Sequence, residues 1–207
     1  YPAAGSPMRG TQPVCLWSAA GLGKSWNVRE FARLNGYGLF VEHPSAPAMD
    51  EIQKMCGSPL PDGAGGWIIP DGTLVKAMRA ASKGINTLFF VDEFARFHPS
   101  AMIWMMTFLP GVKKTKADGT VEMFYRILTA KPDATTGALE ELECSAAHLH
   151  IVAGGNLRQK LDEAIWDRFD HYRIKFTKDL VMQIARGMCA ENGIAAGTLP
   201  ETWANIA

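Results

Sequence analysis

The stretch that most constrains the fold runs from Ser18 to Ser25 and reads Ser-Ala-Ala-Gly-Leu-Gly-Lys-Ser. It follows the apolar run Val14–Trp17 and leads into residues 25–34, which have helical periodicity. An apolar run, a glycine-containing loop and a helix start predict a strand, a tight turn and a helix, because glycine adopts positive φ without steric cost. This order is typical of an α/β domain with a mainly parallel sheet.

The same stretch predicts a phosphate site. Gly21 and Gly23 would let the backbone curl around a phosphate, and the N–H groups at the helix start would point at it. Lys24 would reach the terminal phosphates, and the Ser25 hydroxyl would bind Mg²⁺. The motif departs from G-x-x-x-x-G-K-[ST] at Ser18, which stands in the first glycine position. The alternative is a strand-to-helix turn that binds nothing. The residues expected at the ligand are Ser18, Ala19, Ala20, Gly21, Leu22, Gly23, Lys24, Ser25 and Trp26.

A pair of acids follows the most strand-like run of the chain, Thr87–Val91. A continuous apolar run predicts a strand that is buried on both faces of a parallel sheet. Asp92, at its carboxyl end, could hold Mg²⁺ through water, and Glu93 could orient and deprotonate an attacking water. Acids at strand ends are common, so the pair alone is weak support for a functional site. The phosphate loop upstream is what favours a functional role for it.

Two further polar residues are candidates. Asn156 ends the apolar strand 148–156 and could contact a γ-phosphate or the attacking water. Arg168 ends a short helix, 161–170, ahead of a strand at 171–176, and could stabilise charge on a neighbouring subunit's γ-phosphate. The alternative for Arg168 is a surface ion pair with Asp162 or Asp167.

His148 and His150 share one face of a strand, but no third ligand lies at suitable spacing, so a metal pair is not expected. The remaining segments predict helices and strands around the candidate site. Helices are expected at 48–55, 73–83 and 99–109, and strands at 38–42, 121–129 and 139–144, the last two forming a pair. Residues 60–72 should form an exposed loop or small hairpin, and 111–119 a basic loop.

Composition narrows the protein class. The 207 residues carry a formal net charge of zero, so the protein has no net positive charge that would attract polyanions such as nucleic acids. The four cysteines are widely separated and lack a C-x-x-C pair, which predicts reduced thiols and a cytoplasmic location rather than a disulfide scaffold. No apolar run approaches membrane-spanning length, so no membrane partner is expected. The first residue is Tyr1 rather than Met, which is compatible with a fragment.

Taken in order, the phosphate loop, the Asp-Glu strand end, the strand-terminal Asn and the Asp167-Arg168-Phe169 helix end resemble an AAA+ ATPase. The chain is most similar to the MoxR-like and dynein-related (midasin-type) branch. That similarity rests on Gly66-Trp67 through Gly72-x-Leu74 and on Arg168-Phe169-Asp170, and it covers about residues 12–176.

The resemblance implies a fold and a site. The fold would be a three-layer P-loop NTPase sandwich with a central, mainly parallel five-stranded sheet and the start of a helical lid. Gly21, Gly23, Lys24 and Ser25 match Walker A, Asp92 and Glu93 match Walker B, Asn156 matches sensor 1, and Arg168 matches the arginine finger. The cofactors would be ATP and Mg²⁺, with ATP rather than GTP implied by the resemblance alone. Ser25 and Asp92 would set the metal, and Glu93, Arg168, Asn156 and Lys24 would be catalytic.

The implied activity is Mg²⁺-dependent ATP hydrolysis by a homo-oligomeric, hexameric ring that remodels a protein or macromolecular complex. Family inserts would fall near residues 58–72 and 111–145 and line the central pore. The expected organisation is a lead-in at 1–12, a nucleotide-binding core at 13–176 and a partial lid at 177–207 with one helix, 179–190. Arg186 lies too early to be assigned as a second sensor, so the chain resembles the nucleotide-binding half of a larger protein, or one whose lid is not included.

Two alternatives remain at this point. One is an ATP-gated assembly scaffold with negligible turnover, suggested by Ser18. The other is an ATPase that acts on nucleic acid, as restriction and transposition ATPases do, and its sequence support is the Lys113-Lys114-x-Lys116 loop.

Overall fold

The computed structural model describes residues 12–19, 21–45, 48–115, 118–133, 135–156 and 161–174, with only the backbone described at 48–50. The chain divides into two units, 1–172 and 173–207. The description below concerns the first unit. Most of the predicted lead-in at 1–12, Ala20, and the predicted lid at 177–207 with its helix 179–190 and Arg186 lie outside the described residues.

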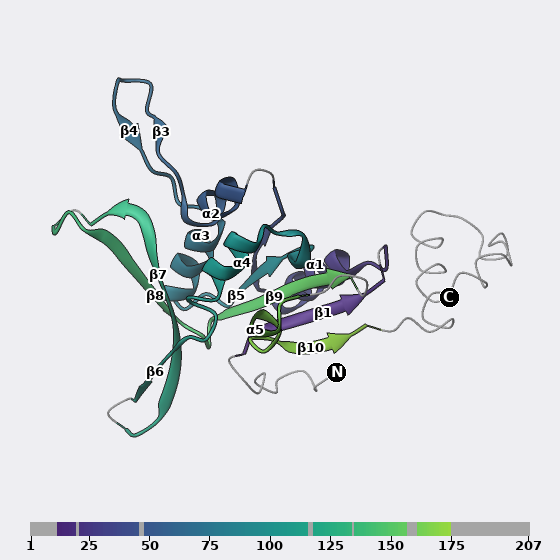
Figure 1. Cartoon of the computed structure of the whole chain (residues 1–207). Helices are drawn as coiled ribbons and strands as arrows, with labels where there is room; N and C mark the ends of the chain where they lie inside the picture. Colours follow the sequence, from purple (N-terminus) through teal and green to yellow (C-terminus); the bar gives the residue numbers. More distant parts are fainter. Residues whose placement is uncertain are drawn as a thin grey trace, which may run out of the picture. The chain divides into compact units, whose positions relative to one another are not determined.

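A five-stranded sheet forms the centre of the first unit, as predicted, in the order β10-β1-β9-β5-β2 (Figure 1). Four of its strands are parallel neighbours. Their carboxyl ends therefore meet at one edge, where Ser18 lies beside Asn156 and Val91 beside Ala153. The strands are β1 (Val14–Ser18), β2 (Gly38–Glu42), β5 (Thr87–Val91), β9 (Leu149–Asn156) and β10 (Asp170–Arg173).

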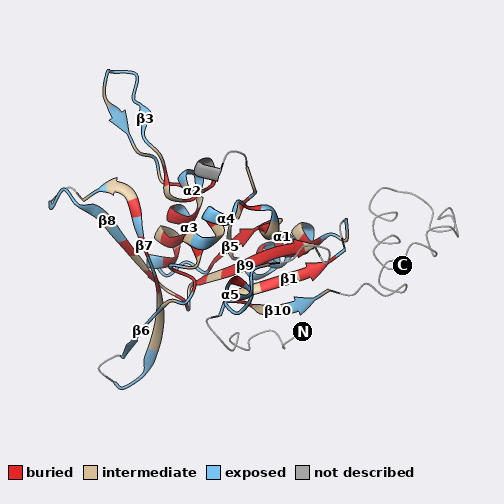
Figure 2. Cartoon of the chain, in the orientation of Figure 1, coloured by how far each residue is buried: buried red, intermediate tan, exposed pale blue. Residues whose placement is uncertain are grey.

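Helices cover both faces of this sheet, because its central strands are apolar on both sides. Every residue of β5 is buried. Leu88 and Phe90 pack with Val28 of α1 (Lys24–Asn35) on one face. Phe89 lies in a larger core on the other face, with α3 (Thr73–Ser82) and α4 (Pro99–Met105). Figure 2 shows this burial concentrated along the sheet and its helices. Truncation of one such phenylalanine to alanine typically costs about 3–5 kcal/mol.

The predicted helices form, but two are shorter than expected. α1 ends at Gly36, whose positive φ of 69° caps it, and α2 spans Ala48–Cys56. Beyond Met105 the chain tightens into i→i+3 turns before Pro110, because the residue before proline disfavours helical geometry. α5 covers only Glu163–Trp166, since the Asp170 N–H already bonds the Pro13 carbonyl at the start of β10. None of the helices in the described part of the chain has the length and apolarity needed to cross a bilayer.

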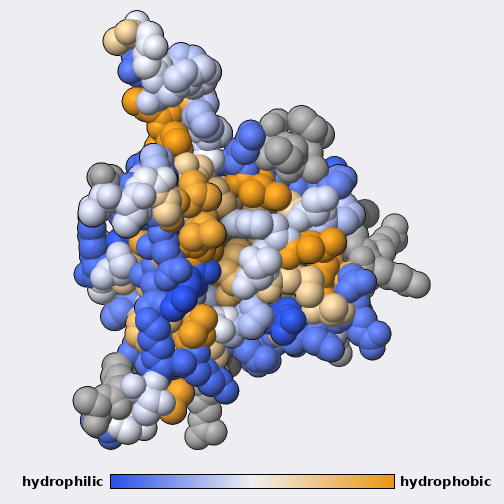
Figure 3. All heavy atoms as spheres, turned by 60° about the vertical axis from the view of Figure 1, so that its left-hand side comes forward, coloured by the Kyte–Doolittle hydropathy of each residue, from blue (hydrophilic) through white to orange (hydrophobic). Residues whose placement is uncertain are grey.

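Two small antiparallel sheets extend from this core (Figure 1). As predicted, β3 (Leu60–Pro61) and β4 (Trp67–Ile68) form an exposed hairpin, and apolar residues appear along its lower part in Figure 3. The second sheet contains β6 (Val112–Thr115), β7 (Val121–Pro132) and β8 (Leu139–Ser145). The prediction of a loop over 111–119 was wrong for 112–115, because the backbone of this segment pairs with β7 while its side chains stay exposed.

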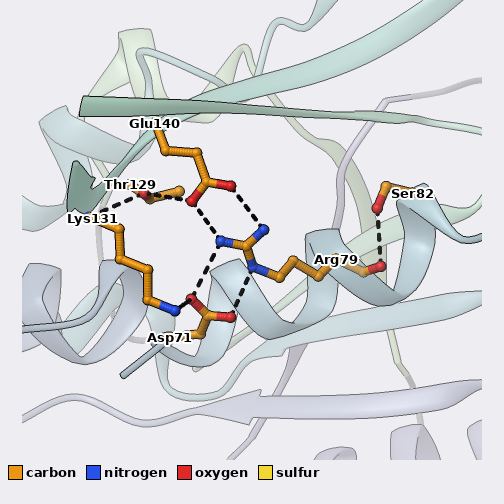
Figure 4. Close-up of polar contacts among 6 residues, drawn as sticks. All are labelled: Asp71, Arg79, Ser82, Thr129, Lys131 and Glu140. Atoms are coloured by element: carbon orange, nitrogen blue, oxygen red, sulfur yellow. Dashed lines mark hydrogen bonds and ion pairs between the residues drawn. The ribbon is translucent and has the colours of Figure 1, made fainter. Parts of the chain in front are cut away.

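An ion cluster fixes the second sheet to α3 (Figure 4). The Arg79 guanidinium donates to Asp71, with Nε 2.8 Å from Oδ2, and to Glu140 of β8, with Nη2 2.5 Å from Oε2. Lys131 of β7 also reaches Asp71, at 2.7 Å. All four side chains of the cluster are partly shielded from water. The cluster therefore holds β7 and β8 at a defined position on the core.

Replacement of Arg79 by methionine should destabilise the chain by about 1–2 kcal/mol at pH 7, as expected for a partly buried pair. The hydrogen bond from Arg79 lowers the pKa of Glu140. Burial would raise the pKa of Asp71, but hydrogen bonds from Lys131 and Arg79 outweigh it and lower this pKa. Lowered carboxyl pKa values stabilise the fold above the unfolded pKa of about 4, so the difference between variant and wild type should shrink as pH falls below about 4.

Urea unfolding of wild type and Arg79→Met between pH 7 and pH 3 measures both the loss of stability and its dependence on pH. The control is Arg33→Met, which removes an exposed pair between Arg33 and Glu30 on α1 and should change stability little. Equal stability of Arg79→Met and wild type at pH 7 would contradict the proposed role of the cluster.

Candidate functional site

A cleft lies at the carboxyl ends of the parallel strands, where ligands bind in open α/β sheets. Its volume is about 380 Å³, within the roughly 300–1,000 Å³ of typical ligand sites. The loop after β1, the start of α1 and the ends of β2, β5 and β9 all contribute to it. The lining residues are Gly21, Leu22, Gly23, Lys24, Ser25, Trp26, His43, Asp92, Glu93, Gly154, Gly155 and Asn156.

Lys24 connects the elements around this cleft. Its ammonium donates to Ser18 Oγ at 2.9 Å, to Asn156 Oδ1 at 3.2 Å and to the Ala19 carbonyl at 3.4 Å. The side chain is largely buried, and this burial lowers its pKa, while Asp92 and Glu93 act in the opposite direction. The lysine of α1 is therefore held between the tips of β1 and β9, with two carboxylates nearby.

Ser18 has a specific task at the position where the motif expects glycine. It is fully buried, and its hydroxyl donates to the Ala19 carbonyl while it accepts from Lys24. Among the predicted ligand contacts, Gly21–Trp26 line the cleft, Ser18 and Ala19 contact Lys24, and Ala20 lies outside the described residues. The serine thus helps to orient the lysine through this hydrogen bond.

The start of α1 presents free backbone donors. Gly21 and Gly23 have φ values of 77° and 70°, and Gly23 occupies the N-cap without a side-chain hydrogen bond to the first turn. The N–H groups of this first turn therefore lack the side-chain acceptor that usually caps a helix. A loop with positive φ that leads into an uncapped twelve-residue helix provides the geometry and partial charge that attract phosphate.

Ser25 and Asp92 form the part of the site that fits a cation. Ser25 Oγ donates to Asp92 Oδ2 at 2.5 Å, and His43 Nδ1 lies 3.8 Å from the same oxygen. Asp92 Oδ1 accepts from the Glu93 N–H, which orients the carboxylate. The described residues contain no cluster of three His, Cys, Asp or Glu side chains for a metal. A hydroxyl with one carboxylate suits Mg²⁺ that is shared with phosphate oxygens, which is how Mg²⁺ usually binds.

Glu93 has a strained backbone and an engaged side chain. Its φ of 50° makes it a non-glycine residue in the left-handed region, and such strain gathers at functional positions. Its carboxylate accepts from Arg96 Nη1 at 2.7 Å, across one turn of a short 3₁₀ helix, Phe94–Arg96. Both side chains are substantially exposed. The residue thus lines the cleft while its carboxylate pairs with an arginine.

His43, Gly154 and Gly155 were not predicted at the site. A β-carbon on Gly155 would come within 2.5 Å of the Trp17 ring, and one on Gly154 within 3.2 Å of Asp92 Oδ1. Glycines inside a buried strand indicate such close approaches, so the Gly-Gly before Asn156 was the available signal. His43 gave no comparable signal, because its position depends on how β2 pairs with β5.

Arg168 lies away from the cleft of its own chain. It is exposed at the end of α5 and is not among the lining residues. A ring stack joins this helix to β1, since Trp166 stacks on Trp17 at 5.3 Å and on His171 at 3.6 Å between ring centroids. The Trp17 N–H also donates to His171 Nδ1. The helix that carries Arg168 is therefore fixed to the strand that precedes the loop.

His148, just before β9, and His150, within β9, make local polar and packing contacts. His148 Nδ1 lies 3.1 Å from Asn86 Oδ1, and His150 packs edge-on against Tyr37 at 5.4 Å between ring centroids. Burial lowers the pKa of His150, which favours a neutral ring. Neither residue lines the cleft.

No protein-family model matches the chain, and a search of curated proteins finds no match. Function is therefore inferred from the geometry of the cleft.

Replacement of Gly155 by alanine should lower stability by about 1–3 kcal/mol, because the added methyl forces Trp17 out of its packed position. Thermal unfolding measures the loss, and near-ultraviolet circular dichroism reports the displaced ring. Gly38→Ala is the matched control, since its β-carbon would meet neighbours at 3.7 Å or more. An unchanged tryptophan signal in Gly155→Ala would contradict the close approach.

Proposed function

We propose that the chain binds a nucleoside triphosphate with Mg²⁺ and hydrolyses its terminal phosphate, with ATP as the nucleotide. One observation carries this proposal: Lys24, the Ser25–Asp92 pair and Glu93 line one cleft at the glycine loop and the start of α1. A phosphate-binding loop beside a strand-terminal acid that holds Mg²⁺ is the combination that P-loop NTPases use for phosphoryl transfer.

The residues of the site divide the chemistry among them. The N–H groups of Gly21–Ser25 would hold the β- and γ-phosphates, and Lys24 would exchange its bonds with Ser18 and Asn156 for phosphate oxygens. Ser25 and Asp92 would hold Mg²⁺, which supplies charge neutralisation at the phosphates. Glu93 would orient a water and accept its proton as the water oxygen bonds to the γ-phosphorus. The bond to the bridging oxygen then breaks, releasing ADP and phosphate.

Asn156 would act beside this reaction. Its amide oxygen accepts a hydrogen bond from Lys24, its neighbour in the sheet is Ser18, and it lines the cleft. From this position the Asn156 amide would hydrogen-bond the γ-phosphate or the attacking water. This supports its assignment as the residue that senses the terminal phosphate.

Several features support an AAA+ type of P-loop NTPase. The central parallel sheet has helices on both faces, and the site residues follow the order expected for that family. Arg168 is exposed and away from its own cleft, as a residue that completes a neighbour's site in a homo-oligomeric ring would be. The β3–β4 hairpin and the β6–β8 sheet would face the pore and contact a protein client.

A second candidate function is an ATP-gated scaffold with negligible turnover, because Arg96 engages the carboxylate that should activate water. The nucleic-acid alternative has weaker support. Lys114 pairs with Glu143 and lies over the Phe124 ring at 5.0 Å, so its charge is already matched within the sheet.

The central test replaces Glu93 by glutamine, which keeps the size of the side chain but removes the base. Steady-state phosphate release should fall about 10²-fold or more, while binding of a slowly hydrolysed ATP analogue persists. Lys24→Ala should instead weaken binding itself. Equal release rates in wild type and Glu93→Gln would exclude hydrolysis at this site, and retained nucleotide binding would then support the scaffold.

Arg96→Ala should raise phosphate release about two- to fivefold, because it frees the Glu93 carboxylate from an exposed ion pair. The control is Arg33→Ala on α1, which breaks an equivalent pair one turn apart with Glu30 and should leave the rate unchanged. A rate that falls in Arg96→Ala would show that the arginine supports catalysis rather than restraining the glutamate.

A further inference from the structure

We propose that the Trp26 ring is the surface on which the nucleobase of the bound nucleotide stacks. This inference rests on the proposed function and adds the part of the ligand that the phosphate loop does not contact. Trp26 lies in the first turn of α1, immediately after Ser25, and is one of the residues that line the same cleft. It remains 61% exposed.

The composition of the cleft favours this role. Apart from Leu22 and His43, its other lining residues offer glycine backbone, charged groups and amide or hydroxyl groups, which suit phosphates and a cation. Leu22 and Trp26 are the apolar side chains among the described lining residues. A nucleobase presents a flat π face, and an aromatic ring is the side chain that best covers it.

The position of Trp26 along the ligand is also suitable. If Lys24 and the loop amides hold the β- and γ-phosphates, the α-phosphate comes nearest the first-turn N–H groups of α1. The nucleoside then leaves this end of the phosphate chain, next to the residue that follows Ser25. A ring at that position meets the base where the cleft opens to solvent.

The other tryptophans show that Trp26 is not simply a packing residue. Trp17 and Trp166 stack on one another, and Trp104 packs against Phe108 at 5.3 Å between ring centroids. Among the described residues, no ring stacks on Trp26 and no acceptor bonds its indole N–H. Trp67 is similarly exposed but lies on the β3–β4 hairpin, outside the cleft lining. Trp26 therefore combines an open ring face with a place in the site.

His43 is the competing platform, because its imidazole also lines the cleft. It lies beside Asp92, with Nδ1 3.8 Å from Oδ2, which is the end of the site assigned to Mg²⁺ and the terminal phosphates. The nucleoside should leave from the opposite end, so Trp26 is favoured. Stacking tolerates every base, so loss of the ring should weaken the binding of ATP and GTP by similar factors.

The experiment is calorimetric titration of the full 207-residue chain. The probes are slowly hydrolysed ATP and GTP analogues and inorganic tripolyphosphate, each with Mg²⁺. Trp26→Ala should weaken both nucleotides by roughly 5- to 150-fold, as for loss of one base-stacking ring, while tripolyphosphate affinity stays within about twofold. Trp26→Phe should retain most of the affinity. Trp67→Ala is the matched control and should bind like wild type.

Other outcomes overturn the inference in distinguishable ways. An equal loss for nucleotide and tripolyphosphate would mean that Trp26 supports the helix start rather than the base. A loss in His43→Ala that is selective for nucleotides, without one in Trp26→Ala, would assign the base to His43. If wild type binds tripolyphosphate as tightly as nucleotide, base stacking is refuted, but the proposed phosphate site is not. Wild type that binds neither probe would refute the proposed function as well.

Discussion

The hydrogen bonds of the Lys24 ammonium are the interaction on which the rest of the site depends. A largely buried lysine needs oxygen partners, and it finds them in Ser18 of β1 and Asn156 of β9, which are direct neighbours in the sheet. These bonds fix α1 relative to two strands, so the helix start and its N–H groups have a defined position. Ser25 then reaches Asp92 across the cleft and adds β5 to the same arrangement.

Much of this arrangement was predictable from local sequence. The apolar runs, the glycine loop and the strand-terminal acids defined the parallel sheet and the edge at which side chains would meet, since carboxyl ends of parallel strands converge. All five strands of the central sheet begin within one residue of their predicted positions. The role of Ser18 was not predictable, because it depends on how the loop brings the Lys24 ammonium back to the end of β1.

The errors have two physical origins. The helix after Pro99 ended early because of the local effect of Pro110, whereas α5 is followed at once by β10, whose Asp170 N–H bonds the distant Pro13 carbonyl. The strand β6 was missed because a basic, exposed segment lacks the apolar alternation that identifies strands, and its conformation is set by pairing with the neighbouring strand β7. His43 was missed for the same reason. Local patterns specify elements, while contacts between elements decide where they stop and what they bring to the cleft.

The ring stack of Trp17, Trp166 and His171 has a mechanical consequence. The Trp17 ring lies close to the backbone of Gly155 and stacks on Trp166, which is two residues from Arg168. Closely packed aromatic rings resist compression, so any displacement of β1 would move α5 and the neighbouring Arg168 with it as one rigid body.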